Sequence, residues 1–295
     1  MIRTALARFS NVLLVLGAAG VGVAAPQLSP YFDPLITPLV VFLVFTSLRG
    51  VRFGSIDYSS YAAIVGLSLF LSYVVLPLAG IRLVELALSD AAVIGFAIAL
   101  SVPATAGSAI IWTRLAGGDA QLATMGSIAS LLVAPVATPL VLTRLVGSRI
   151  AVPTTSILTD LAVIVGGGVL LTAIVPTDAL STETVERSST LAILLLIYTA
   201  VAGVGVFGID ARALLGVVGV AVLLFCLGVA LTAGCQRALG IGRDRGFALW
   251  FTTNLKNLGI ALLVSLPFAE PLVTAAIIVY YVVQQTGGAV IADAT

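Results

Sequence analysis

The sequence has no histidine, two cysteines and a single lysine among 295 residues, and only 9% of its residues are charged. Without histidine, and with only Cys226 and Cys235 as thiols, the common zinc and haem ligation patterns are excluded, and a disulfide scaffold is not expected. A net charge of +1 argues against a nucleic-acid partner. Because a soluble domain carries roughly 25% charged residues, the composition does not fit a soluble protein.

Long apolar runs dominate the chain instead. Hydrophobic residues make up 60% of the sequence, the mean hydropathy is +1.20, and ~20 apolar residues suffice for a helix to cross a bilayer. The runs recur along the whole length, which predicts an all-α polytopic protein of the plasma membrane with about ten transmembrane helices. The expected spans are residues 9–26, 31–48, 59–81, 91–115, 119–146, 151–175, 188–208, 211–237, 246–267 and 271–292.

The arginines predict an orientation. With the N-terminus inside, nine arginines fall on the inner side and four on the outer side, which follows the positive-inside bias. Both termini are therefore expected in the cytoplasm. The inner arginines are Arg3, Arg8, Arg49, Arg52, Arg114, Arg187, Arg237, Arg243 and Arg245. The outer ones are Arg82, Arg144, Arg149 and Arg212. The neighbouring pair Arg144 and Arg149 opposes the bias, and nothing in the sequence accounts for it.

Five spans in each half of the chain indicate a duplication. Similar short segments, 107–111 and 259–263, lie 152 residues apart at equivalent places in spans four and nine. Since five is odd, the second unit must cross the membrane in the opposite sense. The prediction is two inverted five-helix repeats, residues 1–150 and 151–295, with discontinuous helices four and nine crossing near the midplane, an architecture found in transporters.

Span four contains both helix breakers and hydroxyl groups. Pro103 removes a backbone donor and Gly107 lowers helix propensity, so the helix is expected to open there. Thr105 and Ser108 are three residues apart and would share one face of a helix. Because unwound backbone inside a membrane must line a cavity or be buried in protein, this segment is a candidate binding site.

Span nine contains Lys256, the only lysine of the chain, near the middle of its apolar run. A charge at membrane depth costs ~2.5–3.5 kcal/mol on insertion scales, which makes Lys256 a candidate functional residue. The alternative is a lysine that extends to the headgroups from near a helix end. Thr252, four residues earlier, would share its face, and Asn254 and Asn257 flank it. Gln284 and Gln285 in span ten are expected at helix–helix contacts.

Several of these motifs resemble one family. Pro103-Ala-Thr-Ala-Gly-Ser-Ala109, Leu115-Ala-Gly-Gly-Asp119 and Pro135-Val-Ala-Thr-Pro139 are similar to the helix-four and helix-five motifs of the bile acid:sodium symporter family. Asn257-Leu-Gly-Ile-Ala261 and Tyr73-Val-Val-Leu-Pro77 are similar to its helix-nine and helix-three motifs. The chain therefore looks like a divergent prokaryotic member of that family.

The resemblance implies a fold and a mechanism. The family has a panel domain of helices 1, 2, 6 and 7 and a core domain of helices 3–5 and 8–10. It moves mostly organic anions by alternating access with two sodium ions. The expected partners are accordingly a small organic anion and the lipid bilayer, with the chain a monomer or a weak homodimer and no cofactor beyond Na⁺ or H⁺ as a coupling ion.

This sequence departs from the family at the sodium ligands. The helix-nine glutamate shared by both sodium sites falls on Thr252, the following glutamine on Lys256, and the helix-three glutamine on Ser72. In helices four and five the matching polar positions are Ser108 and Ser127. Two like charges ~4 Å apart repel by ~4 kcal/mol at a dielectric of 20, so the hypothesis is that the Lys256 ammonium replaces the second sodium, held by Thr105, Ser108 or freed carbonyls.

The predicted function is therefore secondary transport of a small organic anion with weak or absent sodium coupling. Lys256 can also exchange a proton, which would make transport proton-linked. One alternative keeps a residual sodium site at Ser108, Ser127 and Thr252. Others are an arsenite-type permease, for which span four lacks the cysteine, and a cation/proton antiporter, for which Asp160 is the only acid well inside a span. An enzyme is not expected, because no histidine exists and Ser265 is nine residues from Lys256.

Overall fold

The structure is a computed structural model that describes residues 10–49, 58–177, 179–204, 209–268 and 270–294. Across these ranges the chain is helical and forms no strand, and seven helical segments are long and apolar enough to cross a membrane. The prediction of an all-α multi-pass membrane protein is therefore confirmed. The seven are Pro26–Leu48, Tyr61–Ala87, Ala120–Val146, Thr154–Ile174, Thr182–Gly203, Ala211–Ala238 and Pro271–Ala294.

The other three expected spans are shorter or interrupted. Span one is α2 (Ser10–Ala24). Span four consists of α7 (Asp90–Ser101) and α8 (Ala106–Leu115), and span nine consists of α13 (Arg243–Asn254), α14 (Leu258–Ser265) and the 3₁₀ turn η5 (Leu266–Phe268). Of the residues behind the predicted orientation, Arg3, Arg8 and Arg52 lie outside the described residues, and the orientation stays a prediction.

Spans two and three are built from several helical pieces. Span two contains η1 (Pro26–Leu28), α3 (Ser29–Phe32), η2 (Asp33–Leu35) and α4 (Ile36–Leu48). The three short pieces each have a proline in the first two positions, where the missing N–H costs nothing. Span three contains α5 (Tyr58–Phe70), the π-helical turn η4 (Leu71–Val75) and α6 (Leu76–Ala87).

The remaining spans are continuous helices. They are α9 (Ala120–Val146), α10 (Thr154–Ile174), α11 (Thr182–Val204), α12 (Ala211–Ala238) and α15 (Pro271–Ala294). Helix α11 begins six residues before the predicted span, because the hydroxyl of Ser181 accepts a hydrogen bond from the Thr184 N–H at 3.1 Å and supports its first turn. Polar residues thus extend this helix beyond its apolar run.

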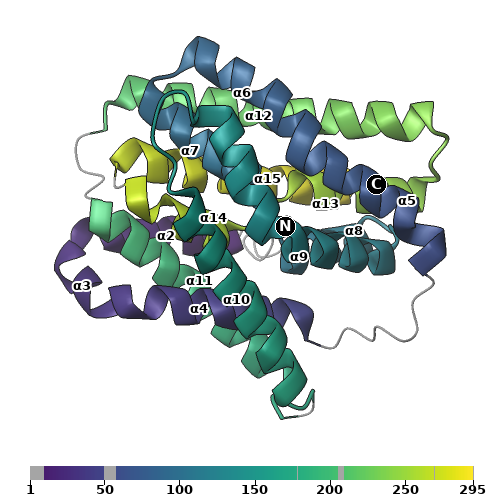
Figure 1. Ribbon diagram of the computed structural model, residues 1–295, viewed down its shortest axis with the longest axis horizontal. Helices are drawn as coiled ribbons and strands as arrows, with labels where there is room; N and C mark the ends of the chain where they lie inside the picture. Colours follow the sequence, from purple (N-terminus) through teal and green to yellow (C-terminus); the bar gives the residue numbers. More distant parts are fainter. Residues whose placement is uncertain (1–9, 50–57, 178, 205–208, 269, 295) are drawn as a thin grey trace.

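Helices α4, α10 and α11 lie in the lower part of the view in Figure 1. Helix α10 packs along both α4 and α9, and α11 packs along α2 and α4. Helix α7 packs against α6, α9 and α15. Gly95 permits the α7–α15 contact, since a Cβ at this position would lie 2.6 Å from the Val273 carbonyl oxygen. The broken spans four and nine are thereby held inside the bundle.

Candidate functional site

The unwound segments of spans four and nine cross one another. Ala104 and Lys256 form an isolated antiparallel bridge. The Thr105 N–H donates to the Leu255 carbonyl at 2.9 Å, and the Asn257 N–H donates to the Pro103 carbonyl at 2.8 Å. These bonds satisfy backbone groups that the interrupted helices leave free, which is a requirement for unwound backbone at membrane depth.

Each break has a local cause. Pro103 has no N–H and pushes the preceding residue out of the helical region, and Val102 is accordingly extended with ψ 160°. The expected opening of span four is found between Ser101 and Ala106, at Pro103, whereas Gly107 lies in the first turn of α8. In span nine, the Asn257 side chain accepts a hydrogen bond from the Ile260 N–H at 3.1 Å. That cap starts α14 and so fixes where the second helix resumes.

The Lys256 ammonium group is enclosed at this crossing. Its side chain does not reach headgroups, since the residue is 3% exposed. The nitrogen Nζ donates to the Ser72 hydroxyl at 2.7 Å, the Ser72 carbonyl at 2.9 Å and the Val102 carbonyl at 3.3 Å. It also lies 5.3 Å from the centre of the Tyr73 ring, within range of a cation–π interaction.

The Ser72 carbonyl is free to bind Lys256 because of the π turn in span three. The Leu76 N–H, which an α-helix would direct to Ser72, instead donates to the Leu71 carbonyl. The next donor along a π-helix would be residue 77, which is a proline and has no N–H. The Ser72 carbonyl therefore has no partner in its own helix, and the ammonium group takes that place.

The neighbouring polar groups fix the crossing to three other helices. Gln284 on α15 accepts a hydrogen bond from the Lys256 backbone N–H at 3.0 Å. Ser130 on α9 accepts one from the Ala104 N–H at 2.9 Å through its hydroxyl. The Tyr73 hydroxyl donates to the Ser130 carbonyl at 2.9 Å. The Tyr73 ring, which lies next to the ammonium group, is thus fixed in position by its hydrogen bond to α9.

No carboxylate accompanies this charge. Among the described residues, Lys256 is the only Asp, Glu, Lys or Arg side chain that is buried, and none of the ion pairs found there involves it. A hydrogen bond to a charged group contributes about 1.5–3 kcal/mol, so three of them offset the ~2.5–3.5 kcal/mol insertion cost of the ammonium group. A neutral oxygen cage of this kind is chemically a cation site.

The structure brings only part of the predicted set to the ammonium group. Ser72 contacts it directly, whereas Thr105 and Ser108 make no hydrogen bond with it. Of the partners expected for Lys256, the structure shows a freed carbonyl, that of Val102, and the replacement of a sodium ion stays a prediction. Thr105 contributes its backbone N–H to the crossing. Ser108 instead accepts a hydrogen bond from Gln285 at 3.0 Å.

Three further predicted residues make no hydrogen bond with the Lys256 side chain. The Thr252 hydroxyl forms a hydrogen bond with Ser68 at 2.8 Å. The Asn254 side chain donates to the Trp250 carbonyl at 2.8 Å. Ser127 is fully buried, and its hydroxyl has no partner. No hydrogen bond among the described residues joins Ser108, Ser127 and Thr252, the three positions expected to form a residual sodium site.

Sequence reasoning missed Val102, Tyr73 and Gln284 as contacts of Lys256. Val102 belongs to no motif, although the proline that follows it signals a free carbonyl in this region. Tyr73 begins the motif that is similar to helix three of the family, but it was not predicted to contact Lys256. Gln284 was expected at a helix–helix contact, and it does join α15 to the crossing, but through the Lys256 backbone. A polar amide in the middle of an apolar span was the signal that pointed to it.

A small cavity adjoins the lysine. Its volume is about 10 Å³, room for one water molecule at most. It is lined by Ala99, Lys256, Asn257, Leu258, Ala261, Ile277, Tyr280, Tyr281 and Gln284. Tyr281 also lines a second cavity of about 90 Å³ against α2 and α11. In this conformation the crossing is closed around the ammonium group.

A bundle of membrane-spanning helices, two of them broken at a polar crossing that is buried among the others, belongs to the class of secondary transporters. Comparison with protein families agrees: the SBF-like CPA transporter family matches residues 12–294. The chain belongs to this family, which is the bile acid:sodium symporter family that its motifs resemble. A comparison with curated proteins finds no match.

Replacing Pro77 by alanine tests how the π turn frees the Ser72 carbonyl. The variant restores an N–H that competes with Lys256 for this oxygen, so we expect the transport rate to fall roughly fivefold, the equivalent of about 1 kcal/mol. Pro135→Ala is the control, because it also restores an N–H inside a spanning helix, α9. Initial rates in proteoliposomes measure both. Wild-type rates in Pro77→Ala would show that the π turn has no role.

Proposed function

We propose that this protein is a secondary active transporter of a small organic anion that works by alternating access without obligatory sodium coupling. The observation that carries the proposal is the cage of Lys256, whose Nζ has three oxygen partners between 2.7 and 3.3 Å. In this proposal the ammonium group takes the place of a bound sodium ion. A further sodium ion ~4 Å away would be repelled by ~4 kcal/mol at a dielectric of 20.

The proposed architecture is two inverted repeats, residues 1–150 and 151–295. The bridged residues Ala104 and Lys256 are 152 positions apart, the same offset as the similar segments of spans four and nine. Applying this offset exchanges the two crossing hydrogen bonds, since residues 105 and 257 are the donors and residues 103 and 255 the acceptors. A pseudo-two-fold axis through the bridge would produce this pattern, as in transporters with inverted repeats.

The proposed panel domain consists of spans one, two, six and seven, which are labelled α2, α4, α10 and α11 in Figure 1. The proposed core consists of spans three to five and eight to ten. Support comes from the packing of α10 and α11 on α2 and α4. The panel also meets the crossing through α14, which packs against α4 and α11. Movement of the panel against the core would open and close the two cavities that Tyr281 lines.

The crossing suits an anionic substrate, because the fixed charges at the crossing are positive. Helices α8 and α14 both begin there, and helix N-termini attract negative charge. Lys256 adds a full positive charge. An arsenite substrate lacks support, since Cys226 and Cys235 lie on α12 and not at the crossing. A cation/proton antiporter also lacks support, since Asp160 is exposed on α10 and bonded to Ser156.

Sodium-free transport is the direct test. Purified protein is first screened by thermal shift against monocarboxylates and sterol acids, such as pyruvate, benzoate and cholate, in sodium chloride and in choline chloride. We expect a stabilising acid to act equally in both salts, because ligand binding raises stability by mass action alone. Uptake of that acid into proteoliposomes should then change less than twofold when choline replaces sodium. A strict requirement for sodium would refute the proposal and favour a retained sodium site near Ser127.

Proton coupling is the second candidate mechanism. It is favoured by one observation, the burial of Lys256 as the only charged side chain enclosed within the described part of the chain. An imposed pH gradient distinguishes the two forms of the proposal. If Lys256 exchanges a proton in each cycle, an inward proton gradient should drive uptake above the equilibrium level. If the ammonium group keeps its charge, the gradient should leave the final level unchanged.

A further inference from the structure

A basic cavity lies at the end of α9, away from the crossing. Arg144, two residues before the end of this helix, lines two adjoining cavities of about 340 and 270 Å³. Ser148 lines both of them as well. The second cavity extends to Arg82 in the middle of α6. Two arginines from different helices therefore border one space at the same end of the bundle.

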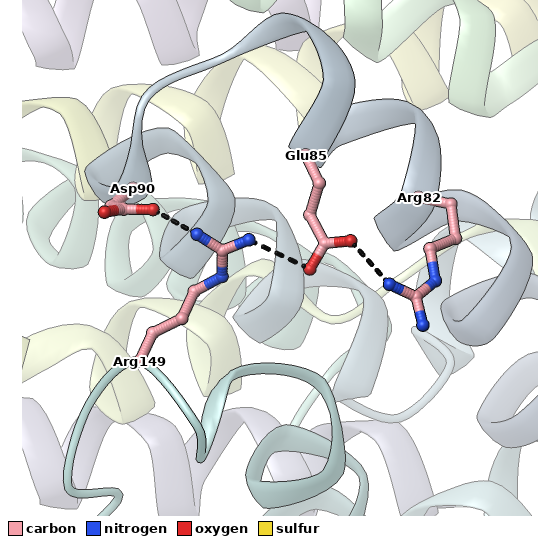
Figure 2. Close-up of polar contacts among 4 residues, drawn as sticks. All are labelled: Arg82, Glu85, Asp90 and Arg149. Atoms are coloured by element: carbon pink, nitrogen blue, oxygen red, sulfur yellow. Dashed lines mark hydrogen bonds and ion pairs between the residues drawn. The ribbon is translucent and has the colours of Figure 1, made fainter.

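The charges around this cavity leave Arg144 uncompensated. Figure 2 shows that Glu85 lies between Arg82 and Arg149 and that Arg149 also reaches Asp90. Both oxygens of Glu85 are occupied, by Arg82 at 3.0 Å and by Arg149 at 3.2 Å. The charged residues that line the second cavity are Arg82, Arg144 and Glu85, and the Glu85 carboxylate is already paired with Arg82 and Arg149. Arg144 is exposed and makes no hydrogen bond or ion pair with any residue that the structure describes.

Apolar side chains lead to each of the two arginines. On α9, Val136 and Leu140 are exposed at spacings of four residues before Arg144. On span three, Val74 and Leu78 are exposed at the same spacing before Arg82. Residues four apart share a helix face. Leu140 also lines the first cavity and Leu78 the second. An apolar surface therefore runs along each helix up to its arginine.

We propose that this cavity binds an anionic phospholipid, with its phosphate between Arg144 and Arg82 and its acyl chains along α9 and α6. The hydroxyl of Ser148 is a further donor to the phosphate. Basic pockets between transmembrane helices bind acidic headgroups, and guanidinium groups pair with phosphate through two parallel hydrogen bonds. In the predicted orientation Arg82 and Arg144 lie at the outer face, where the positive-inside bias disfavours them, and a lipid site would explain why they are there.

Lipid-dependent stability tests the site. Purified protein in a non-ionic detergent is melted with added dioleoyl phosphatidylglycerol, with dioleoyl phosphatidylcholine, or with inorganic phosphate. We expect phosphatidylglycerol to raise the melting temperature by several degrees, phosphatidylcholine to raise it less, and inorganic phosphate to have no effect. Arg144→Gln should lose most of the phosphatidylglycerol shift. Arg212→Gln, an exposed arginine at the start of α12, is the matched control and should keep it.

A second measurement protects the test against variants that misfold. Native mass spectrometry should find one phosphatidylglycerol molecule retained by the wild type and by Arg212→Gln, and none by Arg144→Gln. If Arg144→Gln does not fold, the variants Ser148→Ala and Arg144→Lys replace it in the test. Each should weaken the shift in melting temperature that phosphatidylglycerol causes. Equal shifts in all variants would overturn the proposal. An equal shift with inorganic phosphate would overturn it too, because the site would then bind free anions.

Discussion

Replacing Lys256 by glutamine is expected to lower the transport rate at least tenfold and to make the protein respond to sodium. The variant removes an ammonium group whose hydrogen bonds to Ser72 and Val102 each contribute about 1.5–3 kcal/mol, and 1.4 kcal/mol corresponds to a factor of ten in rate. It also vacates a cage of neutral oxygens and adds an amide oxygen to it. Oxygen ligands of this kind suit a hard cation such as sodium.

The measurement is the melting temperature in sodium chloride and in choline chloride. We expect no difference for the wild type and an increase of a few degrees in sodium for Lys256→Gln, since a ligand at 100 times its Kd stabilises by about 2.7 kcal/mol. Lys256→Met is the matched control, because it removes the charge without supplying an oxygen. It should lose transport without gaining a response to sodium. A wild type that is itself stabilised by sodium would contradict the replacement of sodium by lysine.

The sequence alone predicted the membrane fold and the two interrupted spans, because these depend on local chemistry. Apolar runs require spanning helices whatever their neighbours are, and Pro103 stops a helix by itself. Lys256 was conspicuous for the same reason, since a charge in an apolar run needs partners wherever it lies. The family resemblance, now confirmed over most of the chain, likewise rested on short contiguous motifs.

The partners of Lys256 could not be predicted from helical spacing. Thr105 was predicted to share a helix face with Ser108, three residues later. It instead precedes α8 with an extended backbone (φ −81°, ψ 120°), so helical spacing does not describe this pair. Lys256 was paired with Thr252 in the same way, although α13 ends at Asn254. The actual ligands are two backbone carbonyls and one hydroxyl, and the Ser72 carbonyl is free because of a π turn that no residue pattern predicts.

The close contact between α7 and α15 supports the second large prediction. The Gly95→Leu variant is expected to destabilise the folded protein by about 3 kcal/mol or more, since forcing extra volume into a packed interface costs typically 1–3 kcal/mol. Its Cβ would lie 2.6 Å from the Val273 carbonyl oxygen and 2.8 Å from the Ala276 Cβ. A backbone atom cannot rotate aside as a side chain can, so the two helices must separate.

Separation of α7 from α15 would disturb the crossing, because both helices are connected to it. Helix α7 ends next to Val102, which binds the ammonium group, and α15 holds the Lys256 backbone through Gln284. We therefore expect Gly95→Leu to lower the melting temperature in detergent by several degrees and to abolish transport. Gly219→Leu on the exposed face of α12 is the control, because nothing lies within 4 Å of its Cβ. Equal melting temperatures for the two variants would show that this interface does not position the crossing.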